Sequence, residues 1–332
     1  MPVLRGTYVL LLCCLWSSFH ARAADELSAS MIQKVRRAAI EVHINGQMRG
    51  GGALVKAESG NIYALTAAHL FHSPRDTCSI VTHDDETFPA SLSAYDLGHD
   101  LALLEVDPEA TSRGGLAIAR SIPQDTQGLY NLGPALRRRM LILPGKVADS
   151  RISYTDFASS KGHIRHFFAA GINPVFTSGG MWINQSGQIV GIQHGRLLGE
   201  KAASSGLSLV SPPSAIRELL KSRNVAATPG IGGYVWELRN ADLDMLEKFP
   251  PGTKGLFVNP VFEGRPLNGA GIKAHDLILS CDGRPLTRRF ELLSAIRSKP
   301  VGSTFELVVI TPGKERTRTV ILRTDSLESL WQ

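Results

Sequence analysis

Hydrophobic and polar positions divide the chain into regions with different periods. Residues 8–16 form an uninterrupted apolar run, and segments 28–37 and 215–223 have helical spacing. Between residues 39 and 210, short β-rich runs alternate with turns of Gly, Asn, Asp and Ser, at the spacing typical of an all-β barrel or sandwich. The pattern therefore predicts a mainly β fold flanked by short helices.

The apolar run near the start has the features of a secretory signal. Arg5 precedes it, and Ala21-Arg22-Ala23 follows it as a small-x-small cleavage site. The sequence thus predicts a signal peptide over residues 1–23, cleavage near Ala23, and a secreted or periplasmic protein. Because a membrane helix needs about 20 apolar residues, anchoring by an uncleaved segment is the less favoured alternative.

Length and charge narrow the class of protein. The chain of 332 residues exceeds the usual size of a single hydrophobic core, so two domains are expected. Its formal net charge of +6 is mild, and no aromatic or Gly-rich recognition pattern accompanies the basic triplet 137–139. We therefore expect a solvated basic surface there and no nucleic-acid partner.

Cysteine usage and ligand spacing exclude other classes. Outside the predicted signal the cysteines are Cys78 and Cys281, one in each expected domain. A disulfide between them would lock the domains together, so two buried free thiols are the favoured interpretation, with the pairing left open. The sequence contains no Cys-x-x-Cys or His-Glu-x-x-His spacing and no phosphate-binding Gly-rich loop, so neither a metal nor a cofactor is expected.

Three short motifs carry the candidate chemistry. Residues 66–69, 100–104 and 177–180 present His69, Asp100 and Ser178 in the chain order of chymotrypsin-type proteases. A serine hydroxyl is a poor nucleophile at its own pKa, so His69 would accept its proton while Asp100 holds the imidazole in the useful tautomer. The motifs together predict a catalytic triad.

With these motifs the chain resembles the HtrA/Deg serine proteases, in which a chymotrypsin-like domain precedes PDZ domains. Further similar stretches are residues 50–55, 169–174, 187–192 and 205–212. The resemblance implies a chymotrypsin-like double β-barrel over residues 24–222 and a serine endopeptidase that acts on unfolded or damaged proteins. It also implies a homotrimer, although residues 24–30 lack the aromatic side chains that usually build such an interface.

The C-terminal region resembles a PDZ domain. A polar, small-residue linker is predicted over residues 223–230, and the PDZ domain over residues 231–325. Within it, the strand, helix, strand and hairpin order of residues 255–286 precedes a segment with helical spacing at 290–298. The resemblance implies a peptide-binding groove between a strand and this helix. It also implies that the PDZ domain regulates access to the protease.

PDZ domains add an extended peptide C-terminus as a strand and hold its carboxylate in a nest of backbone N–H groups. In this chain the nest is expected at Ile231, Gly232, Gly233, Tyr234 and Val235. A glycine turn that only precedes a strand is the alternative. Tyr234 stands where the family has a small aliphatic residue, which would narrow the groove.

The resemblance breaks just before the predicted nucleophile. Family members have a glycine two residues before the serine, whose N–H helps form the oxyanion hole, whereas this chain has Phe176 there and one extra residue. The hole is expected at the backbone of Phe176, Thr177 and Ser178. A non-Gly residue tolerates positive φ poorly, and losing one oxyanion donor costs roughly 10²–10³ in rate. Two hypotheses follow: an endopeptidase of low or conditional activity, and an inactive protein retained as a chaperone or PDZ-based sensor.

The predicted substrate pocket lies at the end of the strand 190–192. The resemblance implies that Ile192, Gln193 and His194 line it. Because no acidic residue stands in this stretch, we expect a preference for small or medium apolar side chains rather than for Lys or Arg.

Overall fold

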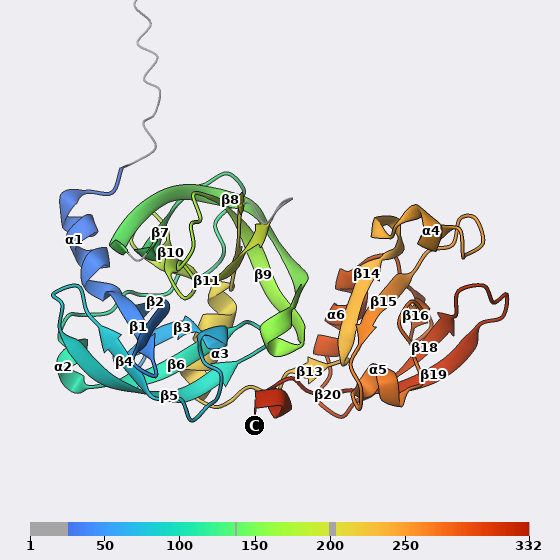
Figure 1. Cartoon of the computed structure of the whole chain (residues 1–332). Helices are drawn as coiled ribbons and strands as arrows, with labels where there is room; N and C mark the ends of the chain where they lie inside the picture. The colour runs from blue at the N-terminus through green and yellow to red at the C-terminus, as the bar shows by residue number, and fades with distance from the viewer. Residues whose placement is uncertain (1–25, 137, 199–203, 332) are drawn as a thin grey trace, which may run out of the picture.

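The structure, a computed structural model, describes residues 26–136, 138–198 and 204–331. Within these ranges the chain forms two closed β-barrels, followed by a smaller module built on an open sheet (Figure 1). The predicted double β-barrel is therefore confirmed. The predicted signal peptide, residues 1–23, lies outside the described residues. No helix in the described ranges is long and apolar enough to cross a membrane.

The first barrel has the strand order β1-β2-β3-β6-β5-β4. Its strands are β1 (Ala39–Ile44), β2 (Gln47–Lys56), β3 (Ile62–Ala67), β4 (Cys78–Val81), β5 (Thr87–Asp96) and β6 (Leu101–Val106). The last residue of β3, Ala67, pairs with the first residue of β6, Leu101. This register brings the residues that follow β3 next to those that precede β6, so His69 and Asp100 meet at one end of the barrel.

The second barrel has the order β10-β11-β12-β9-β8-β7. Its strands are β7 (Gly128–Ala135), β8 (Arg138–Phe157), β9 (Gly162–Gly171), β10 (Met181–Ile183), β11 (Ile189–Leu198) and β12 (Ser204–Val210). In β11 the first six residues are all buried, so both faces of that part of the strand are covered. The turn that carries Ser178 leads directly into β10, which pairs with β11.

In the described part of the chain, three α-helices flank the barrels: α1 (Ala29–Ala38), the single turn α2 (Pro108–Thr111) and α3 (Pro213–Ser222). The hydroxyl of Ser28 caps α1 by accepting a hydrogen bond from the backbone N–H of Met31 (3.2 Å). Proline at the first position of α3 starts that helix two residues earlier than the apolar spacing suggested. Both helices predicted beside the β region are thus confirmed.

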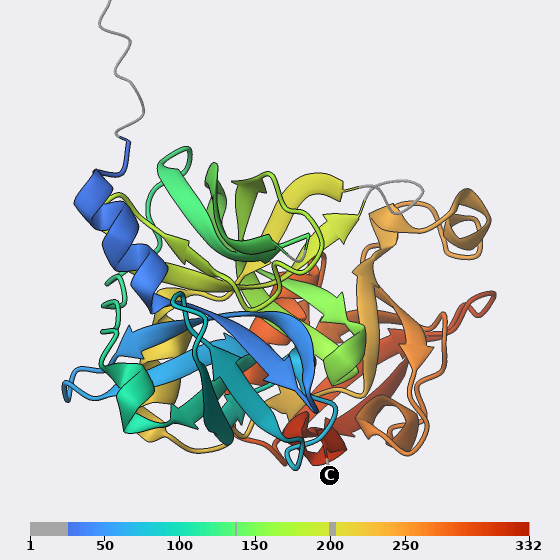
Figure 2. The same ribbon diagram turned by 60° about the vertical axis from the view of Figure 1, so that its left-hand side comes forward.

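The C-terminal module contains a sheet of order β14-β15-β16-β18-β19, with β17 paired to β16. Its elements are β14 (Gly233–Glu237), α4 (Leu243–Leu246), β15 (Leu256–Val261), α5 (Pro266–Gly269), β16 (Leu277–Cys281), β17 (Arg284–Pro285), α6 (Arg289–Arg297), β18 (Thr304–Ile310) and β19 (Arg318–Arg323). The helix predicted at 290–298 is α6, which buries Leu292, Leu293 and Ile296. Edge strand β14 and α6 lie on the side of the module that faces β9 (Figures 1 and 2).

The end of the chain returns to the first barrel. Strand β20 (Asp325–Ser326) pairs with β13 (Pro229–Gly230), which forms the last two residues of the predicted linker. Beyond it, the carboxylate of Glu328 accepts hydrogen bonds from the backbone N–H groups of Leu97 (3.3 Å) and Thr228 (2.8 Å). The Trp331 ring packs edge-on against Tyr95, with the ring centroids 4.5 Å apart. The C-terminal module is therefore fastened to the first barrel through both of its chain ends.

Candidate active site

His69 and Asp100 form a close pair at the end of the first barrel. His69 Nδ1 lies 2.6 Å from Asp100 Oδ2, and the backbone N–H of His69 donates to Asp100 Oδ1 (2.7 Å). Asp100 itself has φ +49, in the left-handed region that Asp tolerates better than most residues. The ring of Phe157 stands edge-on to the His69 ring, at 5.5 Å between centroids. These two side chains thus have the geometry that their predicted joint action requires.

Burial and charge set the protonation of this pair. Burial alone would lower the pKa of His69, but the neighbouring Asp100 carboxylate outweighs it, so the pKa of His69 is raised above 6.5. Burial would likewise raise the pKa of Asp100, but His69 and His194 hold it at about 2. Asp100 is therefore ionised at neutral pH and fixes the Nδ1–H tautomer of His69, which leaves Nε2 free to accept a proton.

Ser178 lies in a tight turn between the two barrels. Its carbonyl accepts a hydrogen bond from Gly51 (2.8 Å), and the next residue, Gly179, donates its N–H to the carbonyl of Gln193 (2.8 Å). Gly179 has φ +79, and a Cβ there would collide with the carbonyl oxygen of Gly51 and the hydroxyl of Thr66. Glycine is required at this position because two strands approach the turn too closely for a side chain.

The hydroxyl of Ser178 does not bond to His69 in this structure. Ser178 Oγ donates to the main-chain carbonyl of His194 (3.2 Å), and within the described residues no hydrogen bond joins Oγ to His69 Nε2. All three predicted catalytic residues thus lie at the junction of the barrels, with the Asp–His link formed and the Ser–His link not formed.

Phe176 has a positive φ, the backbone conformation for which glycine was expected at this position. Its φ is +70, in the left-handed region that favours glycine. Hydrogen bonds brace the loop on both sides of it: the backbone N–H of Leu136 donates to the carbonyl of Val175 (3.0 Å), and Thr177 Oγ1 donates to the carbonyl of Pro174 (2.8 Å). The loop at the predicted oxyanion hole is therefore a braced turn with a phenylalanine in the glycine position.

The three residues predicted to line the substrate pocket have buried side chains. Ile192 lies in the hydrophobic core. The amide of Gln193 accepts from Trp182 Nε1 (3.0 Å) and donates to Thr177 Oγ1 (2.6 Å), which links the core to the loop before Ser178. The imidazole of His194 points at Asp100, with Nδ1 3.5 Å from Oδ2. In this structure all three side chains are buried, and none of them lines an open pocket.

The predicted carboxylate nest sits at the start of β14, in the corner formed with α5. Ile231, Gly232, Gly233 and Val235 are buried, and Tyr234 is partly exposed with its ring edge-on to Phe262 (5.2 Å between centroids). Gly232 has φ +74, and a Cβ there would collide with Arg265 and Pro266. Glycine is therefore needed at this corner for packing.

Strands β8 and β9 of the second barrel cover the outer edge of β14. The backbone N–H of Val235 donates to His163 Nε2 (3.4 Å), and the carbonyl of His163 accepts from Arg297 of α6 (2.8 Å). Arg289 Nη1 forms an ion pair with Asp156 Oδ1 (3.3 Å). Tyr154 is 3% exposed and belongs to the hydrophobic core of the C-terminal module. The strand edge and helix between which a peptide would add are thus occupied by the barrel itself.

Both cysteines outside the predicted signal are free thiols, which settles the alternative left open above. Cys281 is buried as predicted, while Cys78 is only partly buried. Burial raises the pKa of Cys78 to about 12 and that of Cys281 to about 11, so both stay protonated. Among the described residues, no group of three or more His, Cys, Asp or Glu side chains is placed to hold a metal ion.

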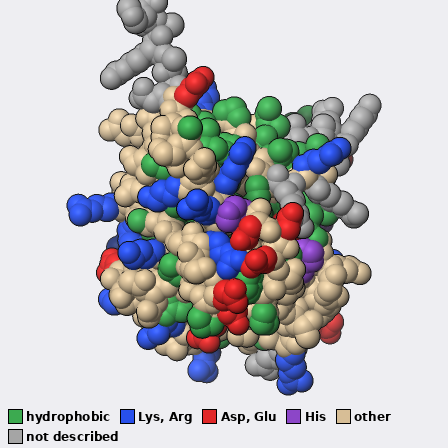
Figure 3. Space-filling view, turned by 90° about the vertical axis from the view of Figure 1, so that its left-hand side faces the viewer, with side chains coloured by type: hydrophobic (Ala, Val, Ile, Leu, Met, Phe, Trp, Pro, Cys, Tyr) green, Lys and Arg blue, Asp and Glu red, His purple; other side chains and the backbone are tan. Residues whose placement is uncertain are grey.

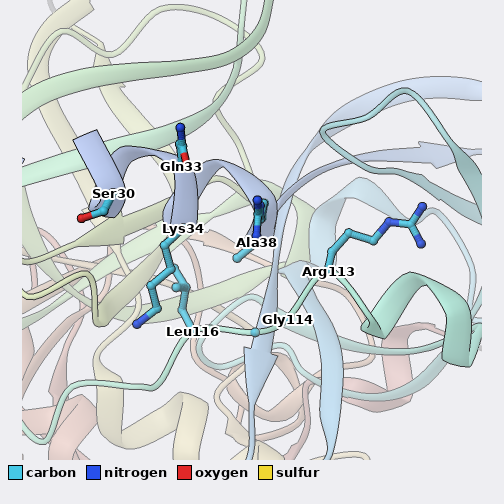
Figure 4. A pocket seen from close by; sticks show the side chains of 9 residues that line it. Ser30, Gln33, Lys34, Ala38, Arg113, Gly114 and Leu116 are labelled. Atoms are coloured by element: carbon cyan, nitrogen blue, oxygen red, sulfur yellow. The ribbon is translucent and has the colours of Figure 1, made fainter. Parts of the chain in front are cut away.

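Two cavities among the described residues lie away from these side chains. One, of about 210 Å³, opens between α1 and residues 113–116, and Figure 4 shows Lys34 and Arg113 at its rim pointing away from each other. A larger one, of about 810 Å³, lies between the β2–β3 turn and α3. On the face shown in Figure 3, Lys and Arg side chains are interleaved with Asp and Glu. Arg113 also forms an ion pair with Asp84 (3.0 Å).

Comparison with known proteins defines the class. Residues 50–192 match the family model of a trypsin-like peptidase domain, and residues 236–322 match that of a PDZ domain. Of solved structures, the HtrA-type protease AlgW with decapeptide superposes with a TM-score of 0.63 at 16% identity, covering 90% of this chain and 98% of that one. The protein is thus a trypsin-like peptidase domain joined to a PDZ domain, and the PDZ prediction is confirmed.

The relatives that match this chain include serine proteases. The chain is 25% identical over 288 residues to the serine protease Do-like HtrA of Bacillus subtilis and 26% identical over 305 residues to the periplasmic pH-dependent serine endoprotease DegQ of Escherichia coli. These alignments cover 82% and 84% of this chain but 63% and 60% of the relatives, so the chain spans less than two thirds of their length. The chain therefore combines a trypsin-like peptidase domain with a PDZ domain and has HtrA-type serine proteases among its relatives, as its motifs predicted.

Sequence reasoning missed two features of these sites. The occupation of the β14 edge by β8 and β9 joins residues about 70 positions apart, such as His163 and Val235, and no local pattern indicates it. The approach of His194 to Asp100 was missed because His194 was assigned to the pocket by its place after the strand. A histidine following an apolar strand gives no signal for which buried carboxylate it faces.

Proposed function

We propose that this protein is a secreted or periplasmic serine endopeptidase of the HtrA type that cleaves unfolded or damaged proteins. Ser178 is the nucleophile, His69 the general base and Asp100 the residue that orients His69. The observation that carries the proposal is the 2.6 Å contact between His69 Nδ1 and the buried Asp100 carboxylate, beside a serine on a glycine-rich turn. The location is supported by the predicted signal and by the printed name of the relative DegQ.

The proposed reaction begins with rotation of the Ser178 hydroxyl from the carbonyl of His194 to His69 Nε2. Oγ then attacks the carbonyl carbon of the scissile peptide bond while its proton passes to Nε2. His69 returns that proton to the leaving amine as the C–N bond breaks, and water, deprotonated by the same imidazole, releases the acyl group from Ser178. The raised pKa of His69 suits it to hold the proton between these steps.

Low or conditional activity is part of the proposal. Phe176 occupies the glycine position at φ +70, and Ser178 is bonded away from its base. These two observations also favour the second candidate function, an inactive protease fold retained as a chaperone or sensor. The two candidates differ in whether Ser178 ever reacts, which an active-site probe or a proteolysis assay decides.

We further propose that the PDZ domain binds peptide C-termini and that this binding competes with its docking on the barrel. Support comes from the hydrogen bond between Val235 N–H and His163 Nε2, because that N–H lies on the strand edge to which a peptide would add. Peptide binding and docking then use the same edge. The substrate preference proposed for the protease domain remains small or medium apolar residues.

Casein proteolysis tests the protease function. Ser178→Ala, His69→Ala and Asp100→Ala should each reduce cleavage to background while the far-UV circular dichroism spectrum is retained. Ser186→Ala, in the exposed turn between β10 and β11, is the matched control and should keep the wild-type rate. Wild-type cleavage by Ser178→Ala would eliminate the triad.

Fluorescence anisotropy tests the PDZ proposal. A labelled peptide with a free C-terminus should bind more tightly than its amide, because a nest of N–H groups favours the carboxylate. His163→Ala removes a docking contact outside the predicted nest, so it should strengthen binding of the acid. Equal affinity for acid and amide would remove the peptide-binding claim, and an unchanged affinity in His163→Ala would remove the competition claim.

A further inference from the structure

Asp100 is approached by a second histidine besides His69. The side chain of His194 is fully buried, and its Nδ1 lies 3.5 Å from Asp100 Oδ2. That oxygen is also the acceptor for His69 Nδ1 at 2.6 Å, while Oδ1 accepts the backbone N–H of His69. One carboxylate therefore faces two imidazoles, one from each barrel.

The ring of His194 lacks other partners. Neither of its nitrogens has a hydrogen-bond partner among the described residues. A buried polar group without a partner is costly, so such groups are normally paired. The Nδ1–Oδ2 separation exceeds a normal N–H···O bond by about 0.6 Å, and hydrogen bonds at catalytic groups are often long before substrate binds.

We propose that His194 is a positioning residue whose neutral imidazole donates Nδ1–H to Asp100 Oδ2, so that two histidines hold the carboxylate that orients His69. This inference rests on the proposed function, since it assigns a role within the same triad. The main chain of His194 also holds the Ser178 hydroxyl, so one residue contacts both ends of the triad.

The charges around His194 favour its neutral form. Burial lowers the pKa of His194, and the nearby His69 and His99 lower it further, while Asp100 opposes them. His166 also lies close enough for its own pKa to be lowered by His194. Because burial and the two imidazoles of His69 and His99 oppose a proton on His194 and a single carboxylate favours it, His194 is neutral in the pH range in which His69 acts as the base.

The consequence is a reduced basicity of His69. A second N–H donor stabilises the negative charge on Oδ2, so less of that charge acts on His69. Removing the donor leaves the carboxylate to His69 alone, which should raise the pKa of His69. If His194 acted only through packing, the pKa of His69 would not depend on whether residue 194 offers an N–H donor.

Histidine ring NMR tests the proposal in full-length mature protein carrying Ser178→Ala, which needs no catalytic activity. Two-bond ¹H–¹⁵N spectra should show His194 as the Nδ1–H tautomer at neutral pH. The Nε2–H tautomer would overturn the proposal without any change at His194.

The same spectra give the pKa of His69 in a matched pair of variants. His194→Leu removes the donor and should raise the pKa of His69 by about 0.5–1. This change corresponds to a fraction of the free energy of a hydrogen bond to a charged group. Asparagine has nearly the same shape as leucine but keeps an N–H near the Nδ1 position. His194→Asn should therefore leave the pKa of His69 within about 0.2 of the parent value. His166→Gln, a buried histidine bonded to Thr155, is the control and should also have no effect.

Equal pKa values of His69 in His194→Leu and His194→Asn would overturn the proposal. If His194→Leu does not fold, the tautomer measured in the parent protein decides alone. Because these measurements are made on Ser178→Ala, their outcome is independent of whether the wild type cleaves protein, which the casein assay decides.

Discussion

Replacing Phe176 by glycine should accelerate catalysis with little change in stability. Phe176 has φ +70, which costs a non-glycine residue roughly 1–2 kcal/mol, and glycine removes this cost. Against that gain, the half-buried ring loses about 1 kcal/mol of burial, and glycine adds about 0.5–1 kcal/mol of chain entropy to the unfolded state. These contributions nearly cancel, so the free energy of unfolding should change by less than about 1 kcal/mol.

The rate should change far more than the stability. If Phe176 keeps one oxyanion donor from its working position, restoring that donor is worth roughly 10²–10³ in kcat. The hydrogen bonds that brace Val175 and Thr177 remain in the variant and limit how far the loop relaxes. We therefore expect kcat to rise by about 10–10³-fold in Phe176→Gly, within the magnitude of one donor.

Phe176→Ala is the matched control, because it removes the ring but keeps a Cβ at positive φ. Turnover of a fluorogenic peptide by the two variants separates crowding by the ring from strain in the backbone. If the backbone is responsible, Phe176→Gly is much faster than Phe176→Ala; if the ring is responsible, the two are equally fast. A wild-type rate already typical of proteases, with neither variant faster, would refute the reasoning about this loop.

Three further predictions follow from charge and packing. Activity requires neutral His69, so kcat/KM should fall as pH decreases, with a midpoint above pH 6.5 because the pKa of His69 is raised; a midpoint below 6.5 contradicts this. Burial first, and then the nearby arginines, hold the pKa of His163 well below 6.5, so protons favour the undocked form below that pH. Affinity for a peptide acid, measured by anisotropy, should then rise from pH 7.5 to 5.5 in wild type but not in His163→Phe. Gly179→Ala should lower the free energy of unfolding, measured in urea, by about 1–3 kcal/mol more than Gly60→Ala, since Gly60 has open space around it at a similar φ; equal losses would refute the clash.

The parts of this structure that the sequence predicted depend on short-range patterns. The apolar segment before His69 and the apolar run after Asp100 form neighbouring strands, and the register of these strands brings the two residues together. The helix after Ser28 carries its own cap, and the glycine position held by Phe176 correctly predicted a demanding backbone conformation.

The parts that the sequence did not predict depend on long-range packing. Six consecutive buried residues begin β11, so alternation carries no information there about which face Gln193 and His194 present. The cover over β14 depends on side chains of β8 and β9 that are distant in sequence and individually ordinary, such as Tyr154 and His163. The pattern within a segment indicates that a residue is buried, but it does not indicate which part of the protein packs against that residue.

The central claim is that Ser178 is a nucleophile activated by His69. Intact-protein mass spectrometry after incubation with a fluorophosphonate probe tests it most directly, because the probe reacts with activated serines and does not depend on the substrate. One adduct, located at Ser178 by peptide mapping and absent from Ser178→Ala, is the predicted result, with faster labelling in Phe176→Gly. No adduct in either the wild type or Phe176→Gly, with both proteins folded, would contradict the claim. The remaining candidate function would then be that of an inactive protease fold retained as a chaperone or sensor.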